Sequence, residues 1–215
     1  MSDNLEIPEL HRLATAYAPV TSRGTWTAWF ALDAHLAALV GKASEPMLGQ
    51  IRLAWWRDRL GEERGLWPKG NPVLSALARD WPGDADTLIP LVDGWENLLV
   101  EPPIGPESIA SFAEGRAQSL TALATAADHT NDVARAARRW AVADLLVHSG
   151  HAEERATILG AAKALGPEPV RLPREYRPLA ILDGLARRTL AKGGGPLFEG
   201  RAAALAVLRL GMFGR

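Results

Sequence analysis

The chain of 215 residues contains no cysteine, which excludes disulfide staples, thiolate metal sites and a cysteine nucleophile. Lysine is also scarce, because 20 of the 24 basic residues are arginines. There is no dense Lys/Arg run of the kind found in nucleic-acid-binding arms, so we expect no nucleic-acid partner. No apolar stretch reaches the 18 or so residues of a membrane span, and the acidic start MSDNLEIPEL does not resemble a secretory signal. Together these absences predict a cytoplasmic protein.

The most abundant residues are good helix formers. There are 37 alanines and 31 leucines, and alternating runs of Val, Ile and Thr are missing. The chain length suits one domain, and 47% apolar with 23% charged residues is ordinary globular usage. We therefore predict an all-α fold, a single-domain helical bundle over residues 1–215.

Proline and capping residues mark where the helices begin. Helix starts are predicted at Ser44-Glu45-Pro46, Asn71-Pro72, Gly105-Pro106 and Thr130-Asn131-Asp132. Breaker clusters between them divide the chain into about eight to ten helices, and the Gly-rich LAKGGGPLF stretch is interpreted as a linker. The segment from Leu48 to Leu60 is apolar on two faces, which predicts a helix at the centre of the bundle.

Two histidines, His148 and His151, are followed by Glu153 and Glu154. Gly150 between the histidines indicates a helix end, and no further ligand has the spacing of a zinc motif. We interpret the group as a helix-terminal pair of histidines beside solvated carboxylates. No metal site is predicted here.

The candidate residues for a ligand-binding cavity are Asp93, Glu96, Asp144, Trp55 and Trp56. Asp93 and Glu96 lie one helical turn apart, whereas Asp144 is a lone acid in an apolar context, where pairing to an Arg or His is the simpler interpretation. Trp55 and Trp56 point about 100° apart on a helix, so they cannot both face one pocket. For the tryptophans in general, core packing is the plainer reading.

Residues 171–215 carry nine basic and three acidic side chains. Near the end of this segment Phe198, Ala202, Leu205 and Leu208 share one side, with Arg201 and Arg209 nearby. Such a stripe more often closes the core. The alternative is that it lies on an anionic bilayer, which would give peripheral contact with the inner membrane in place of a purely cytoplasmic location.

Three stretches resemble, in order and spacing, the all-helical squalene/phytoene synthase family, and within it the non-catalytic branch that includes a mitochondrial complex I assembly factor. These stretches are FALDAHLAALVGKASEPMLGQIRLAWWRDRL, LIPLVDGWENLL and RLPREYRPLAILDGLARRTL, about a third of the chain. The most specific part runs from Glu45 to Asp58 and is similar to the family's helix that ends in an aromatic–Trp–basic cluster. The resemblance implies the isoprenoid synthase fold.

Family enzymes condense two prenyl diphosphates with Mg²⁺ held by two aspartate-rich motifs. The resemblance places the first motif near Ala37 and Ala38, with its last acid near Gly41, and the second in LLVHSGHAEERATILGAAKAL. Neither stretch carries the paired acids, and without them the diphosphate charge has no counter-ion. The resemblance thus implies a protein without catalytic residues and without a cofactor.

The leading hypothesis is a non-catalytic protein that binds a partner protein, as in respiratory-complex assembly, or a hydrophobic isoprenoid-like ligand. The alternative is an active, Mg²⁺-dependent prenyltransferase of isoprenoid, carotenoid or hopanoid biosynthesis with a rearranged site. That site would use Asp93, Glu96 and Asp144, and it requires the three carboxylates to converge.

Overall fold

The structure, a computed structural model, describes residues 5–43, 45–123 and 129–214. Every regular element in these ranges is helical, which confirms the all-α class. The α-helices are α1 (Glu9–Ala16), α2 (Val20–Gly41), α3 (Pro46–Gly61), α4 (Pro72–Asp80), α5 (Ile89–Glu96), α6 (Pro106–Thr121), α7 (Thr130–His148), α8 (Ala152–Ala164), α9 (Arg177–Ala191) and α10 (Gly200–Phe213). Short 3₁₀ turns are η1 (Arg64–Leu66), η2 (Ala85–Leu88) and η4 (Arg174–Tyr176).

The helices begin where proline and capping residues predict. Helices α3, α4 and α6 each start at a proline, which loses nothing at a position whose N–H has no helical partner. The side chain of Asn71 caps α4 by accepting hydrogen bonds from the amides of Val73 and Leu74 at 3.0 and 3.1 Å. Helix α7 starts at Thr130, as expected, and Ser44 lies outside the described residues.

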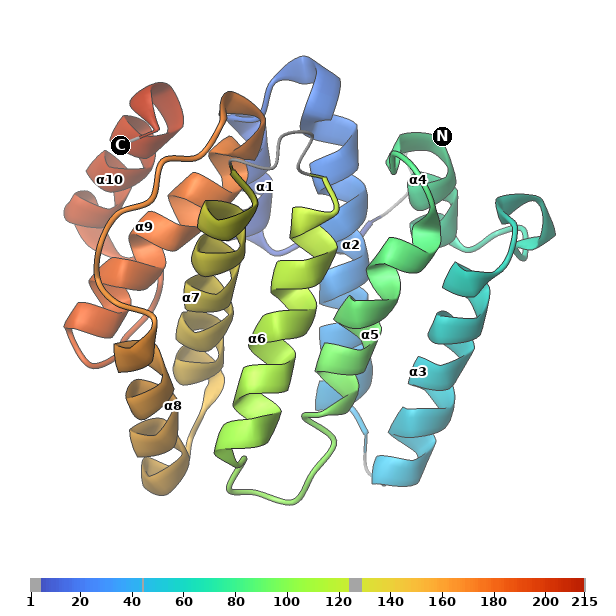
Figure 1. The fold of residues 1–215 in the computed structure, drawn as a ribbon, viewed down its shortest axis with the longest axis horizontal. Coiled ribbons are helices and arrows are strands. Elements are labelled where there is room, and N and C mark those ends of the chain that lie inside the picture. Colours follow the sequence, from blue (N-terminus) through green and yellow to red (C-terminus); the bar gives the residue numbers. More distant parts are fainter. Residues whose placement is uncertain (1–4, 44, 124–128, 215) are drawn as a thin grey trace.

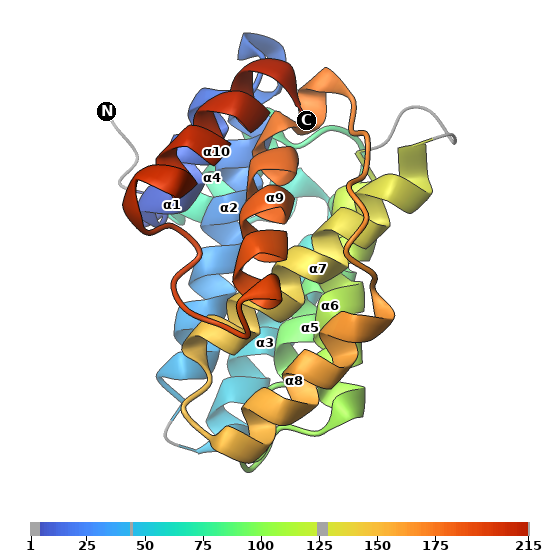
Figure 2. The ribbon, with the colours of Figure 1, turned by 90° about the vertical axis from the view of Figure 1, so that its left-hand side faces the viewer.

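The long helices stand side by side as a bundle (Figure 1). Along one face the order is α3, α5, α6, α7 and α9, and each packs against the next. Helix α2 runs behind this row and contacts α1, α3, α4 and α5. Turned by 90°, the bundle shows α10 packed on α9 at the edge opposite α3 (Figure 2).

The core is built around α2 and α7 and is rich in aromatic rings. Trp26, Trp29 and Phe30 of α2 and Trp140 of α7 are fully buried, and their rings contact one another at centroid distances of 5.5–6.0 Å. Seven of the eight tryptophans are buried, Trp55 being the exception. The core reading of the tryptophans is therefore confirmed for all but one.

The prediction of a central position for residues 48–60 is wrong. Helix α3 lies at the edge of the bundle, because α5, α2 and η2 cover it from one side only. Leu53, Trp56 and Leu60 face that side and are buried. Its second apolar face, with Leu48, Ile51 and Trp55, is exposed to solvent. Central position belongs instead to α2, whose apolar residues are covered from several directions.

A buried ion pair fixes α9 to α7. Arg139 donates to both carboxylate oxygens of Asp183 at 2.7 and 2.9 Å, and its remaining nitrogen donates to the carbonyl oxygens of Gly166 and Glu168. Burial raises the pKa of Asp183 from its ordinary value, against the opposing effect of the Arg139 charge. Every polar atom of this guanidinium is thus used structurally.

Candidate functional site

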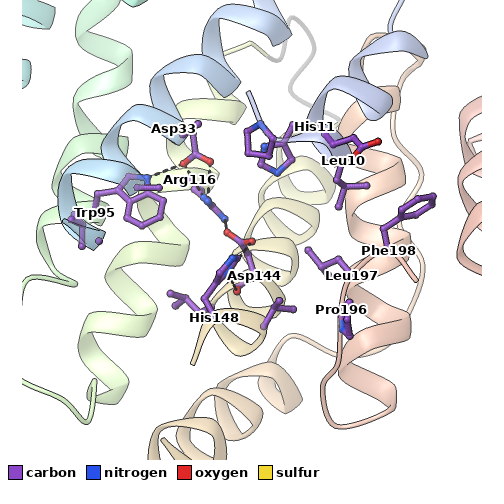
Figure 3. A pocket seen from close by; sticks show the side chains of 18 of the residues that line it. Leu10, His11, Asp33, Trp95, Arg116, Asp144, His148, Pro196, Leu197 and Phe198 are labelled. Carbon is purple, nitrogen blue, oxygen red and sulfur yellow. Dashed lines mark hydrogen bonds and ion pairs between the residues drawn. The ribbon is translucent and has the colours of Figure 1, made fainter. Parts of the chain in front are cut away.

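A cavity of about 720 Å³ lies between the N-terminal helices, α7 and the segment that precedes α10. Figure 3 shows its polar floor on one side and the apolar residues Leu10, Leu197 and Phe198 on the other. The lining residues are Pro8, Glu9, Leu10, His11, Leu13, Asp33, Ala34, Ala37, Val40, Gly41, Trp95, Arg116, Asp144, Leu145, Val147, His148, Pro196, Leu197 and Phe198. Most of them are apolar, as in typical small-molecule sites.

The polar floor is built on Arg116 of α6, whose side chain is fully buried. Its Nε and one terminal nitrogen donate to the two carboxylate oxygens of Asp33 on α2, at 3.1 and 2.8 Å. The other terminal nitrogen donates to Asp144 Oδ2 on α7 at 2.8 Å. One guanidinium therefore connects three helices and bridges two carboxylates.

Aromatic rings surround the Arg116 guanidinium. The rings of Trp95, Phe112 and Trp140 have centroids 5.3, 4.6 and 4.3 Å from its central carbon, which places them within cation–π range. Trp95 also donates its indole N–H to Asp33 Oδ1 at 2.8 Å. Burial by itself lowers the pKa of Arg116, but the charges and hydrogen bonds of Asp33 and Asp144 outweigh it and raise that pKa. Arg116 thus carries its charge permanently.

The charges of the floor do not favour an anionic ligand. Arg116 is the one Lys or Arg among the described residues lining the cavity, and it is bound by two carboxylates. His148, at the end of α7, lies with Nδ1 2.8 Å from the carbonyl oxygen of Asp144 and 3.6 Å from Asp144 Oδ1. Two carboxylates and one guanidinium give the trio of Asp33, Arg116 and Asp144 a formal charge of −1, which repels a diphosphate, and the carboxylates accept hydrogen bonds from a donor.

His11 of α1 lines the same cavity but is almost wholly covered by aromatic neighbours. Its ring stacks on Phe30 at 4.6 Å and meets the edge of Trp140 at 5.4 Å. Burial lowers the pKa of His11 below its ordinary value, although the charges of Asp33 and Asp144 act in the opposite direction. His11 is accordingly neutral in the folded protein at pH 7.

A pH dependence of stability follows from the lowered pKa of His11. Below about pH 6.5 the unfolded chain takes up a proton that the folded chain does not, so stability is lost as the pH falls through that range, by up to about 1.4 kcal/mol per pH unit for one histidine. Burial also lowers the pKa of His35, so both residues contribute. We expect chemical denaturation between pH 7.5 and 5.5 to show a shallower loss for His11→Leu than for the unchanged chain. Equal slopes would contradict the neutral state of His11.

The structure separates the candidate residues taken from the sequence. Asp144 faces the cavity and is paired with Arg116, as its apolar context suggested. Asp93 and Glu96 both bind Arg57 of α3 near the surface and do not line the cavity. The three carboxylates of the rearranged metal site are therefore not brought together.

The adjacent tryptophans contact each other edge-to-face at a centroid distance of 5.3 Å, but one is buried and the other exposed, so they do not face one pocket, as their spacing predicts. Trp56 is buried against His35 with ring centroids 5.0 Å apart, whereas Trp55 is exposed beneath Arg59. Neither residue lines the main cavity. The cavity described above therefore does not use either tryptophan, although both were candidates for ligand binding.

The histidine pair lies at helix ends, as interpreted from the sequence. His148 is the last residue of α7, and His151 immediately precedes α8. The expectation of solvated carboxylates beside them is wrong for Glu154, which is buried and accepts hydrogen bonds from the Ile104 amide and the Ser149 hydroxyl. Glu154 satisfies backbone and side-chain donors at the start of α8, which is a structural role.

Sequence reasoning missed Arg116, the residue that organises the floor. A faint signal existed, since Arg116 follows Phe112 by four residues and therefore lies on the apolar face of its helix. An arginine in that place needs buried acidic partners. Its partners are far away in sequence, at separations of 83 and 28 residues, and a single sequence does not single them out.

The positions at which the family resemblance places the metal motifs border this cavity. Ala37 and Gly41 of α2 line it, as do Leu145 and His148 of α7, whereas Ala38 faces a different hollow. Among the described residues no group of three or more His, Asp or Glu is placed to hold a metal ion, and no helix is long and apolar enough to cross a bilayer. No protein-family model, curated protein or solved structure matches the chain.

Proposed function

We propose that the chain is a non-catalytic squalene/phytoene synthase-like protein that binds a hydrophobic, isoprenoid-like ligand in the cavity between α1, α2 and α7. The observation that carries this proposal is a cavity with largely apolar walls in which Arg116, the one basic residue of the described lining apart from histidine, is paired with two carboxylates. An apolar wall favours a hydrocarbon chain, and a neutralised cation leaves no partner for a diphosphate.

The dimensions of the cavity suit a small hydrophobic molecule. About 720 Å³ lies within the range of roughly 300–1,000 Å³ that is usual for such sites. The hydrocarbon chain would lie against Leu10, Leu13 and Leu197, away from the polar floor. A ligand hydroxyl at the floor would donate to Asp144 Oδ1, because the hydrogen bond from Arg116 goes to the other carboxylate oxygen, Oδ2.

The same residues argue against condensation chemistry. Mg²⁺ requires several hard oxygen ligands, and where the resemblance places the first acidic motif α2 presents the methyl group of Ala37 and the backbone of Gly41. Asp33 and Asp144 are already committed to Arg116, and removing them to bind a metal would leave that guanidinium buried without a partner.

Blocking the cavity tests the proposal. Titration calorimetry with farnesol, a neutral isoprenoid alcohol, is expected to show saturable binding to the unchanged chain. Ala37→Phe places a ring in the cavity and is expected to weaken binding at least tenfold, because the ring occupies volume that the ligand needs. Ala38→Phe is the matched control, since the next residue of α2 faces another hollow, and it should bind farnesol normally.

Two results would overturn the proposal. One is the absence of saturable farnesol binding to the unchanged chain. The other is equal affinity of Ala37→Phe and the unchanged chain, which would place the ligand elsewhere. Circular dichroism of both variants establishes that each is folded before affinities are compared.

A further inference from the structure

Helix α10 has two apolar faces, and only one of them is covered. Ala203, Ala206, Val207 and Leu210 are buried where α10 packs against α9. The approach to α9 is close, because a Cβ at Gly184 of α9 would meet the Leu210 side chain at 2.2 Å. This inner stripe closes the core, so the outer residues are not needed for that purpose.

The outer face of α10 carries large apolar residues and two arginines. Leu205, Leu208, Met212 and Phe213 are all exposed there, so the interpretation that the stripe of Leu205 and Leu208 closes the core is wrong. At 100° per residue, Arg201 and Arg209 fall about 40° to either side of Leu205, so both cations lie on the same exposed face as the apolar residues. No acidic residue occurs between Gly200 and Phe213.

This pattern fits one kind of partner best. An exposed face that combines large apolar residues with two arginines, on a helix without acidic residues, complements a surface that offers hydrocarbon beneath a layer of negative charge, because long arginine side chains extend back to the headgroups. The wider segment 171–215 also carries a net positive charge, with nine basic and three acidic residues. A helix of 14 residues, about 21 Å long, lies within the membrane interface without spanning the bilayer.

The segment that leads into α10 forms part of the cavity wall. Pro196, Leu197 and Phe198 line the cavity and belong to the segment that runs directly into α10. Figure 3 shows Leu197 and Phe198 on the wall opposite the polar floor, and Phe198 is itself exposed. A surface that received α10 would therefore also lie next to the cavity wall.

We propose that the outer face of α10 docks in the plane of an anionic lipid bilayer, with Leu205, Leu208 and Met212 inserted between lipid chains and Arg201 and Arg209 at the headgroups. Docking in this way presents Phe198 and the cavity mouth to the membrane. The docking itself depends only on α10, whereas its use as a route for a hydrophobic ligand rests on the proposed function.

Vesicle binding of the full chain, without any added ligand, tests the docking. We expect co-sedimentation with vesicles of phosphatidylcholine containing 30% phosphatidylglycerol, weak binding to pure phosphatidylcholine, and a loss of binding as salt is raised. The double variant Arg201→Gln/Arg209→Gln is expected to bind anionic vesicles roughly 30-fold more weakly, since each basic residue near such a surface contributes about a fivefold factor.

A matched pair of variants separates α10 from exposed apolar surface in general. Leu205→Glu/Met212→Glu places charge at residues that are 66% and 59% exposed, and it is expected to abolish vesicle binding. Met47→Glu/Ile51→Glu makes the same change on α3, at residues 69% and 61% exposed, and should leave binding unaltered. Neither pair touches the core, so both variants should fold.

Three outcomes would overturn the docking proposal. They are equal binding to neutral and anionic vesicles, loss of binding in the α3 variant rather than in the α10 variant, and a concentration-dependent dimer of the unchanged chain that Leu205→Glu/Met212→Glu dissociates. The last would make a second copy the occupant of this face. Farnesol binding is measured without vesicles, so failure of the cavity proposal and failure of docking are distinguished.

Discussion

Replacing Arg116 with methionine is expected to destabilise the fold by about 3–5 kcal/mol, because it leaves Asp33 and Asp144 without their cation. Asp33 is fully buried and would keep the Trp95 indole as its remaining donor. For a chain of this length the loss corresponds to a melting temperature lower by roughly 6–20 °C. Urea denaturation followed by circular dichroism measures it.

The rescue of this variant distinguishes an uncompensated charge from a packing defect. Methionine fills much of the arginine volume, so the cost should come mainly from the two carboxylates. Adding Asp33→Asn and Asp144→Asn to Arg116→Met removes those charges and is expected to recover a large part of the lost stability. Two results would contradict this role of the trio of Asp33, Arg116 and Asp144. One is an unfolding free energy of Arg116→Met within about 1 kcal/mol of that of the unchanged chain, and the other is a triple variant that recovers no stability.

Gly115→Ala is expected to cost about 3 kcal/mol, a large effect for one methyl group. Helices α5 and α6 approach so closely that a Cβ at Gly115 would lie 2.2 Å from the carbonyl oxygen of Pro90 and 2.9 Å from Cα of Gly94. These neighbours are backbone atoms, so rotation of a side chain offers no relief and one helix must shift. The shift would disturb Arg116 and Trp95, which neighbour the two glycines.

A Gly→Ala substitution at a helix position with open space around it should instead increase the stability. Gly160 lies in the interior of α8, is exposed and has nothing within 4 Å of a built Cβ. Gly160→Ala is therefore expected to stabilise the chain by about 0.5–1 kcal/mol through helix propensity. Thermal denaturation gives the melting temperatures of both variants. A Gly115→Ala variant as stable as Gly160→Ala would refute the close contact of α5 and α6.

The local features of the fold could be predicted from the sequence because their causes are local. Proline at the first position of α3, α4 and α6 and the Asn71 cap act through neighbouring residues. That Trp55 and Trp56 point in different directions follows from helix geometry alone. For the same reason the helical ends at His148 and His151 were predictable.

Features that depend on distant partners were not predictable. The two-faced apolar pattern of α3 resembles that of a central helix, yet which faces are covered depends on the neighbours that the chain supplies. In the sequence, Asp93 and Glu96 look like a pair of carboxylates available for a ligand. In the fold, both form ion pairs with Arg57 of another helix. The floor of the cavity likewise requires α2, α6 and α7 to meet at Arg116, and no spacing within one helix encodes that.

The central claim is that the cavity takes a neutral hydrophobic ligand and performs no condensation. The most direct measurement titrates the chain with farnesyl diphosphate beside farnesol, with Mg²⁺ present and then chelated, while released pyrophosphate is assayed. We expect saturable farnesol binding, weaker binding of the diphosphate that Mg²⁺ does not strengthen, and no pyrophosphate. Mg²⁺-dependent binding of farnesyl diphosphate with pyrophosphate release would contradict it and identify an active prenyltransferase.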